Sequence, residues 1–109
     1  MGALTREFKE MVVRRAERDP EFRLEMLKTG IELLLTGVPE DAAIGREKLR
    51  TYINATIGFE RLAADLGKSP KSLMRMFSPS GNPSLSNLSS VIGELQRAEG
   101  VRLEVREAS

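Results

Sequence analysis

Apolar residues recur at three- and four-residue spacing along most of this chain, which is the period of amphipathic helices. With Pro, Ser, Asp and Gly at the boundaries, the pattern predicts helices near residues 5–18, 20–35, 39–56, 59–66, 70–77 and 85–99. Within residues 22–35 the apolar positions cover more than one face, so this helix needs cover on two sides. The predicted fold class is mainly α.

The stretch from Gly58 to Leu88 predicts two short helices across a tight corner, then a loop and a third helix. Gly67 ends the first of these helices, Ser69 caps the second, and Pro70 takes its first position. The second helix turns an apolar face to one side, formed by Leu73, Met76 and Phe77. Its other side carries Lys71, Ser72, Met74 and Arg75. Such a pair, with a basic outer face on the second helix, predicts a helix-turn-helix.

These residues resemble the lambda-repressor-like (Xre/Cro) helix-turn-helix family, over roughly residues 48–100. The resemblance is carried by Leu62-Ala63, Leu66-Gly67, Ser69, Ser72-Leu73, Arg75 and the run Gly81 to Leu85. Within that superfamily, the run from Leu73 to Ser84 and the closing segment Gly100 to Val105 look like the addiction-module antidote (antitoxin) branch. The resemblance implies a helix-turn-helix domain at residues 39–100, with residues 1–38 as an N-terminal helical extension packed on it.

The C-terminal segment, residues 101–109, is expected to form a short β-strand and a tail, because VRLEVR alternates apolar and charged residues. A lone strand needs a partner. Two copies paired antiparallel about Leu103 would bring Val101 opposite Val105 and Arg102 opposite Glu104. The sequence therefore predicts a two-fold dimer joined partly through residues 101–105. A frayed end, or a strand offered to a different protein, is the alternative.

Base contacts are expected from Lys71, Ser72 and Arg75, with Met74 at the edge of the same face. Arg donates in a fork that matches guanine O6 and N7, and Lys reaches guanine or a phosphate. A Met side chain can touch a thymine methyl group. The alternative is an ordinary solvated helix surface, which the family resemblance disfavours.

Phosphate contacts are expected from the free N–H groups at the helix start near Phe59, and from six side chains: Arg61, Lys68, Ser69, Ser80, Asn82 and Ser84. Asn82 is equally well explained as a turn residue between Gly81 and Pro83. Phe59 and Pro70 stand where many family members place polar residues, so base reading would rest on few side chains. Specificity would then depend more on DNA shape and dimer spacing.

Composition excludes several kinds of chemistry. The chain has no Cys and no His, which removes thiolate nucleophiles, imidazole bases and the commonest zinc sites, so we expect no enzyme activity, cofactor or metal. No apolar run approaches the length needed to cross a bilayer, and no signal-peptide pattern is present, so a cytoplasmic protein without a membrane partner is expected. The net charge is only +1, but Arg61 to Phe77 holds four cations against Asp65 alone.

Two functions follow as expectations. The first is a sequence-specific regulator that binds double-stranded DNA as a homodimer on a near-palindromic operator. The alternative, implied by the antidote resemblance, is an antitoxin that neutralises a RelE/ParE-type toxin by protein–protein binding, with or without control of its own operon. The broad apolar helix of residues 22–35 and the N-terminal pair of helices would serve such a partner.

Overall fold

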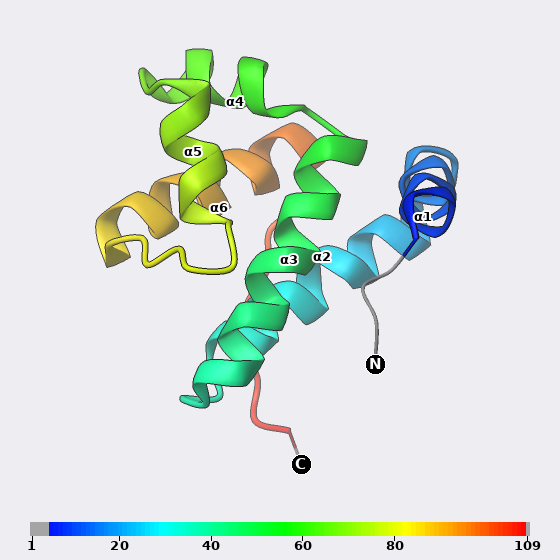
Figure 1. Cartoon of the computed structure of the whole chain (residues 1–109). Coiled ribbons are helices and arrows are strands. Elements are labelled where there is room, and N and C mark those ends of the chain that lie inside the picture. Colours follow the sequence, from blue (N-terminus) through cyan, green and yellow to red (C-terminus); the bar gives the residue numbers. More distant parts are fainter. Residues whose placement is uncertain (1–4, 109) are drawn as a thin grey trace.

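A computed structural model describes residues 5–108 and contains six helices in this range (Figure 1). They are α1 (Arg6–Arg18), α2 (Pro20–Leu34), α3 (Pro39–Ala55), α4 (Phe59–Leu66), α5 (Pro70–Met76) and α6 (Leu85–Glu99). The mainly α class is confirmed, and the helix bounds lie close to those predicted. Local capping explains this agreement, because the side chains of Thr5, Asp19, Ser69 and Ser84 each accept the N–H of the residue three positions on.

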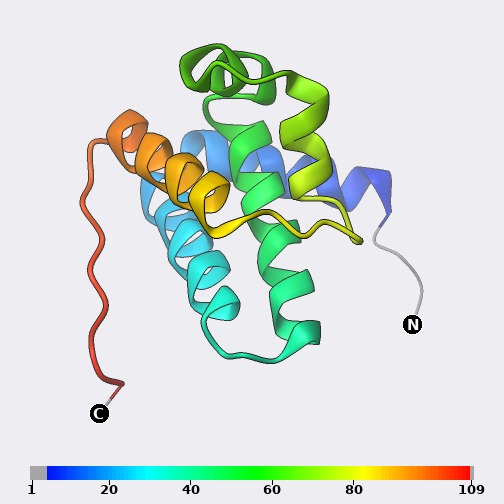
Figure 2. The same cartoon turned by 90° about the vertical axis from the view of Figure 1, so that its left-hand side faces the viewer.

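The helix α3 lies at the centre and packs along α2, and α1 crosses near both, while α4, α5 and α6 lie together near the C-terminal half of α3 (Figures 1 and 2). One apolar core joins these elements. Its members come from every helix except α1: Leu27, Leu49, Tyr52, Ile53, Phe59, Leu62, Ala63, Leu73, Met76, Phe77, Val91 and Leu95. The N-terminal region therefore contributes to the same core as the last four helices, through Leu27.

The contact between α2 and α3 depends on two glycines that face each other. A Cβ added to Gly45 would lie 2.7 Å from the carbonyl oxygen of Gly30, and one added to Gly30 would lie 2.9 Å from a methyl carbon of Leu49. Such distances are shorter than van der Waals contact, so the helices approach this closely only because both residues lack a side chain.

A polar cluster also ties the N-terminal helices to the end of α6. Arg23 of α2 donates from Nε to both carboxylate oxygens of Glu99, at 3.2 and 3.0 Å. The hydroxyl of Tyr52 donates to the same carboxylate. Burial, together with this hydrogen bond to a carboxylate, raises the pKa of Tyr52 well above its usual value. The cluster links α2, α3 and α6 at one point.

The apolar stripe predicted on the first helix is only partly buried. Ala16 is fully buried and Val12 is half-buried, but Phe8 and Met11 are 44% and 55% exposed. They lie toward the N-terminal half of α1, where no other described helix covers this side of it. The N-terminal helix thus carries apolar side chains in contact with solvent.

The predicted C-terminal strand is wrong for the single chain, because no strand forms within residues 5–108. Residues 101–108 leave α6 as an extended segment without regular secondary structure (Figure 2). The physical reason is that no second strand lies beside it to complete a ladder. Val101 and Leu103 are half-buried, whereas Arg102, Glu104 and Val105 are exposed.

None of the helices in the described part of the chain is long and apolar enough to cross a membrane.

Candidate nucleic-acid interface

The corner between α4 and α5 is built by backbone hydrogen bonds and one side-chain cap. Gly67 takes a left-handed conformation (φ 67°), which allows the N–H of Lys68 to reach the carbonyl of Ala63 at 2.9 Å. Two residues later the hydroxyl of Ser69 accepts the N–H of Ser72 at 3.1 Å. Pro70 then starts α5 without leaving an unpaired N–H group. The turn is therefore short and fixed at both ends.

The inner face of α5 anchors this helix in the core. Leu73 and Phe77 are almost completely buried, and Met76 is 9% exposed. The rings of Phe77 and Phe59 lie 6.4 Å apart between centroids in a tilted arrangement. Because three large side chains on one face are buried, α5 is unable to rotate about its axis. The residues on its other face therefore point in a fixed direction.

The outer face of α5 presents two cations to solvent. Lys71 and Arg75 are exposed, Met74 is 40% exposed and Ser72 is half-buried. Neither Lys71 nor Arg75 forms an ion pair with any residue in the range 5–108. All four predicted base-contacting residues therefore share one helix face, and the guanidinium and ammonium groups are available to a ligand.

The predicted phosphate contacts fall into two groups. Ser80 and Asn82 are exposed in the loop between α5 and α6, and Lys68 lies half-buried in the turn. Ser69 and Ser84 are exposed, but their oxygens already accept N–H groups as helix caps. A hydroxyl that accepts one hydrogen bond can still donate its own proton. Both serines thus remain able to bind a phosphate oxygen.

At Phe59 the predicted phosphate contact involves the backbone N–H groups of the helix start and not the side chain. Its ring is only 4% exposed because it packs in the core against Phe77. The side chain is therefore unable to touch a phosphate, and only the backbone N–H at the start of α4 is left for that role. Gly58 precedes this helix and supplies no side-chain cap, so the first N–H groups of α4 have no side-chain acceptor there.

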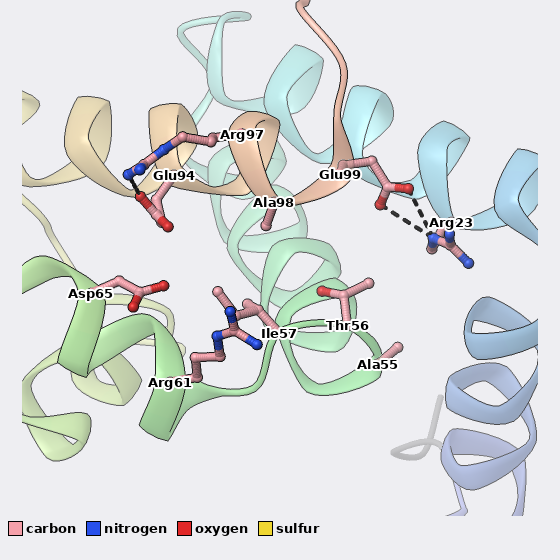
Figure 3. Close-up of a pocket in the computed structure, with 10 residues that line it drawn as sticks. All are labelled: Arg23, Ala55, Thr56, Ile57, Arg61, Asp65, Glu94, Arg97, Ala98 and Glu99. Atoms are coloured by element: carbon pink, nitrogen blue, oxygen red, sulfur yellow. Dashed lines mark hydrogen bonds and ion pairs between the residues drawn. The ribbon is translucent and has the colours of Figure 1, made fainter.

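Arg61 lies in a different setting from the other predicted contacts. Figure 3 shows this exposed side chain pointing into a cleft between α4 and α6. The cleft has a volume of about 690 Å³ and is also lined by Asp65, Glu94, Arg97 and Glu99. Two cations in it are already paired, Arg97 with Glu94 and Arg23 with Glu99. Arg61 is thus separated from the face that carries Lys71 and Arg75.

The loop that follows α5 is held from behind by Arg46 of α3, a residue that sequence reasoning did not single out. Its guanidinium donates to the carbonyl of Ser78 at 3.3 Å and to that of Pro79 at 3.0 Å. Gly81 completes the loop, because a Cβ there would lie 2.2 Å from the carbonyl oxygen of Met76. These contacts fix the segment that carries Ser80 and Asn82. Nothing in the sequence around Arg46 distinguishes it from other Arg residues on helix surfaces, so its hydrogen bonds to this loop could not be predicted.

No group of His, Cys, Asp or Glu residues in the described range is arranged to hold a metal ion. Comparison with known proteins gives no assignment: no protein-family description, curated protein or solved structure matches this chain.

Proposed function

We propose that this protein is a sequence-specific regulator of the lambda-repressor-like class that binds double-stranded DNA. In this proposal α4 and α5 are the two helices of a helix-turn-helix, and α5 enters the major groove. The observation that carries it is the pair Lys71 and Arg75, which are exposed and have no carboxylate partner within residues 5–108, on a helix fixed by its buried face. Arg75 would donate to a guanine, and Lys71 to a guanine or a phosphate.

The loop after α5 supports the same proposal. Ser80 and Asn82 lie exposed on a segment held by Arg46, next to the end of α5. In such an arrangement the loop contacts the sugar-phosphate backbone and fixes how deep α5 sits in the groove. Two copies on a near-palindromic site would set their α5 helices into successive major grooves, about 34 Å apart.

A binding assay with duplexes from the intergenic region upstream of the gene tests the proposal. The variant Lys71→Ala/Arg75→Ala should lose affinity by at least about 30-fold, because each base contact contributes about 1–3 kcal/mol. The matched control is Lys9→Ala/Arg18→Ala, which removes the same two residue types from exposed positions of α1. It should bind like the unchanged protein.

Two results would contradict the assignment. Binding that survives the α5 double substitution would remove α5 from the interface. Equal loss in the α1 control would mean that only total charge matters. A fall of log affinity with log salt at about −0.9 per neutralised phosphate is expected for the unchanged protein.

A second candidate function is that of an antitoxin that binds a RelE/ParE-type toxin. It is favoured by apolar side chains that contact solvent on the N-terminal half: Phe8 and Met11 on α1, and Ile44, 48% exposed, in a groove between α1 and α3. The test is whether a neighbouring small gene is toxic when expressed and is rescued by this protein. Rescue should fail for Phe8→Ser/Met11→Ser while DNA binding persists. A harmless neighbour would remove this candidate and leave the first one standing.

A further inference from the structure

The groove between α1 and α3, here called the α1/α3 groove, has a volume of about 610 Å³ and three walls. One wall is a stripe along α3, where side chains at three- and four-residue spacing share a face: Ala43, Glu47, Arg50 and Asn54. The facing wall belongs to α1, and the third is residues 77–79. Small-molecule sites are usually clefts of about 300–1,000 Å³. The α1/α3 groove is therefore large enough for a small organic molecule.

Much of the lining of the α1/α3 groove is apolar. Val12 and Val13 of α1 are half-buried, Phe77 is buried, and Ile44 is 48% exposed. A ligand with an apolar body would cover these side chains and remove their surface from water, which is favourable. The lining therefore suits an aromatic or aliphatic body.

The charged side chains of the α1/α3 groove favour an anion. Lys9 and Arg50 come from opposite walls, both are exposed, and neither forms an ion pair within residues 5–108. Glu47 is the one acidic side chain in the lining, and it does not pair with Arg50 although it precedes it by about one helical turn. Two cations against one carboxylate attract a negative group. The amide of Asn54 is a further hydrogen-bond donor in the lining.

We propose that the α1/α3 groove binds a small, water-soluble organic acid. Its apolar body covers Val12, Val13 and Phe77, and its carboxylate pairs with Lys9 and Arg50. A guanidinium suits this role because it donates two parallel hydrogen bonds to a carboxylate. The exposed apolar side chains at the start of α1 lie outside this lining, so a protein bound there would contact a different surface.

The third wall connects the α1/α3 groove to the proposed DNA interface. Ser78 and Pro79 line the groove, and their carbonyls accept the hydrogen bonds from Arg46. A ligand packed against this wall stabilises the loop in the arrangement that exposes Ser80 and Asn82. By thermodynamic linkage, such a ligand raises the affinity for DNA. This regulatory step rests on the proposed function, whereas the ligand site does not.

Titration of the full chain with phenylbutyrate, followed by amide NMR shifts, tests the ligand site. We expect a dissociation constant of about 1 mM or below, with shifts at Val13, Thr51 and Ser78, which all line the α1/α3 groove. Phenylbutanol keeps the apolar body without the charge and should bind about tenfold more weakly. Phenylbutylamine reverses the charge and should bind more weakly still.

Substitution of Arg50 tests how the carboxylate is recognised. Arg50→Ala should weaken phenylbutyrate binding about tenfold and leave phenylbutanol binding unchanged. A merely structural role of Arg50 would weaken both ligands alike. The matched control is Arg18→Ala, which removes an exposed Arg of α1 outside the groove lining and should bind phenylbutyrate like the unchanged protein.

The regulatory step is tested with the intergenic duplex. Phenylbutyrate at a saturating concentration should raise the DNA affinity of the unchanged protein about fivefold, with a smaller response in Arg50→Ala. Equal DNA affinity with and without the acid would overturn this step. A protein that binds the acid but no DNA would contradict only the proposed function.

Three results would overturn the ligand site: no shift with phenylbutyrate at millimolar concentration, equal affinity for the acid and the amine, or shifts centred on the cleft between α4 and α6. A toxin protein that shifts the amides of Val13, Thr51 and Ser78, when the acid shifts none of them, would assign the α1/α3 groove to a protein partner instead.

Discussion

The outer face of α5 and the cleft between α4 and α6 both carry basic side chains, but these side chains differ in their ion pairing. In the cleft, Glu99 accepts two hydrogen bonds from Arg23, and Glu94 pairs with Arg97. On α5, Lys71 and Arg75 have no such partner among the described residues. The largely buried pair of Arg23 and Glu99 therefore stabilises the fold, whereas the charges of Lys71 and Arg75 are exposed to an external anion. Counting charges along the sequence does not separate the two cases.

The largest difference between the two regions should appear in the free energy of unfolding when Glu99 is substituted. Glu99→Ala leaves Arg23 and Tyr52 without their shared acceptor at a largely buried position, so we expect a loss of about 3 kcal/mol in the free energy of unfolding. Denaturant unfolding measures it. Lys71→Ala/Arg75→Ala should change the same quantity by less than about 0.5 kcal/mol.

The control for that experiment is Glu10→Ala, which breaks an exposed ion pair with Arg14 at 3.8 Å. This substitution should lower the free energy of unfolding by less than about 0.5 kcal/mol. If Glu99→Ala proved as mild as this control, the cleft would be no more structural than the outer face, and the contrast between the two regions would be lost.

Gly81 should give the next largest effect, because it shapes the loop beside the outer face. Gly81→Ala puts a Cβ 2.2 Å from one backbone carbonyl oxygen and 2.7 Å from another, so the loop must move, at a cost of about 2 kcal/mol. In Gly93→Ala the new Cβ meets nothing within 4 Å, and a helical Ala should stabilise by about 0.5–1 kcal/mol. Thermal unfolding should show opposite signs for the two substitutions. The same sign for both would mean that the loop is loosely packed.

Arg46 should affect DNA binding more than stability. Arg46→Ala frees the carbonyls of Ser78 and Pro79 and releases the loop that carries Ser80 and Asn82. We expect about fivefold weaker DNA binding, and a shallower salt dependence because phosphate contacts are lost. Arg50→Ala, on the same helix and without a hydrogen bond to the loop, is the control. Equal effects of both substitutions would assign the change to charge alone.

The smallest expected effect is the contribution of Tyr52 to the pH dependence of the free energy of unfolding. The folded protein raises the pKa of this phenol above the unfolded value of about 10, so folding holds the proton more tightly. The resulting stability is fully present below pH 10 and is lost as pH rises above it. Tyr52→Phe should therefore unfold with a weaker pH dependence between pH 9 and about 11 than the unchanged protein, as urea titrations at each pH would show. Identical slopes would contradict the raised pKa of Tyr52, which burial and the hydrogen bond to Glu99 cause.

The helices and the faces of α5 could be predicted from sequence because their causes are local. Ser69, Ser84 and Gly67 act within a few residues of their own positions, and the spacing of Leu73, Met76 and Phe77 identifies the buried side. The predicted base-contacting residues consequently share one exposed face. Their contact with DNA stays a prediction.

Other features depend on residues far apart in the chain, and sequence reasoning missed them. The burial of Phe59 follows from its contact with Phe77, and the role of Arg46 follows from a loop more than thirty residues later. The alternation in residues 101–105 predicts a strand, but a strand needs a neighbour that residues 5–108 of this chain do not supply. The expected dimer would supply it.

The glycine contact between α2 and α3 sets a limit on how far the protein can be shortened. The backbones of α2 and α3 are in contact at Gly30 and Gly45. Helix α2 therefore packs along α3 and shields Leu49 from solvent. A fragment beginning at Val38 would keep all of α4, α5 and α6, but it would expose to solvent the side of α3 that α2 covers. Helices α4, α5 and α6 therefore share one apolar core with α2 and α3, and we expect such a fragment to be less stable than the full chain.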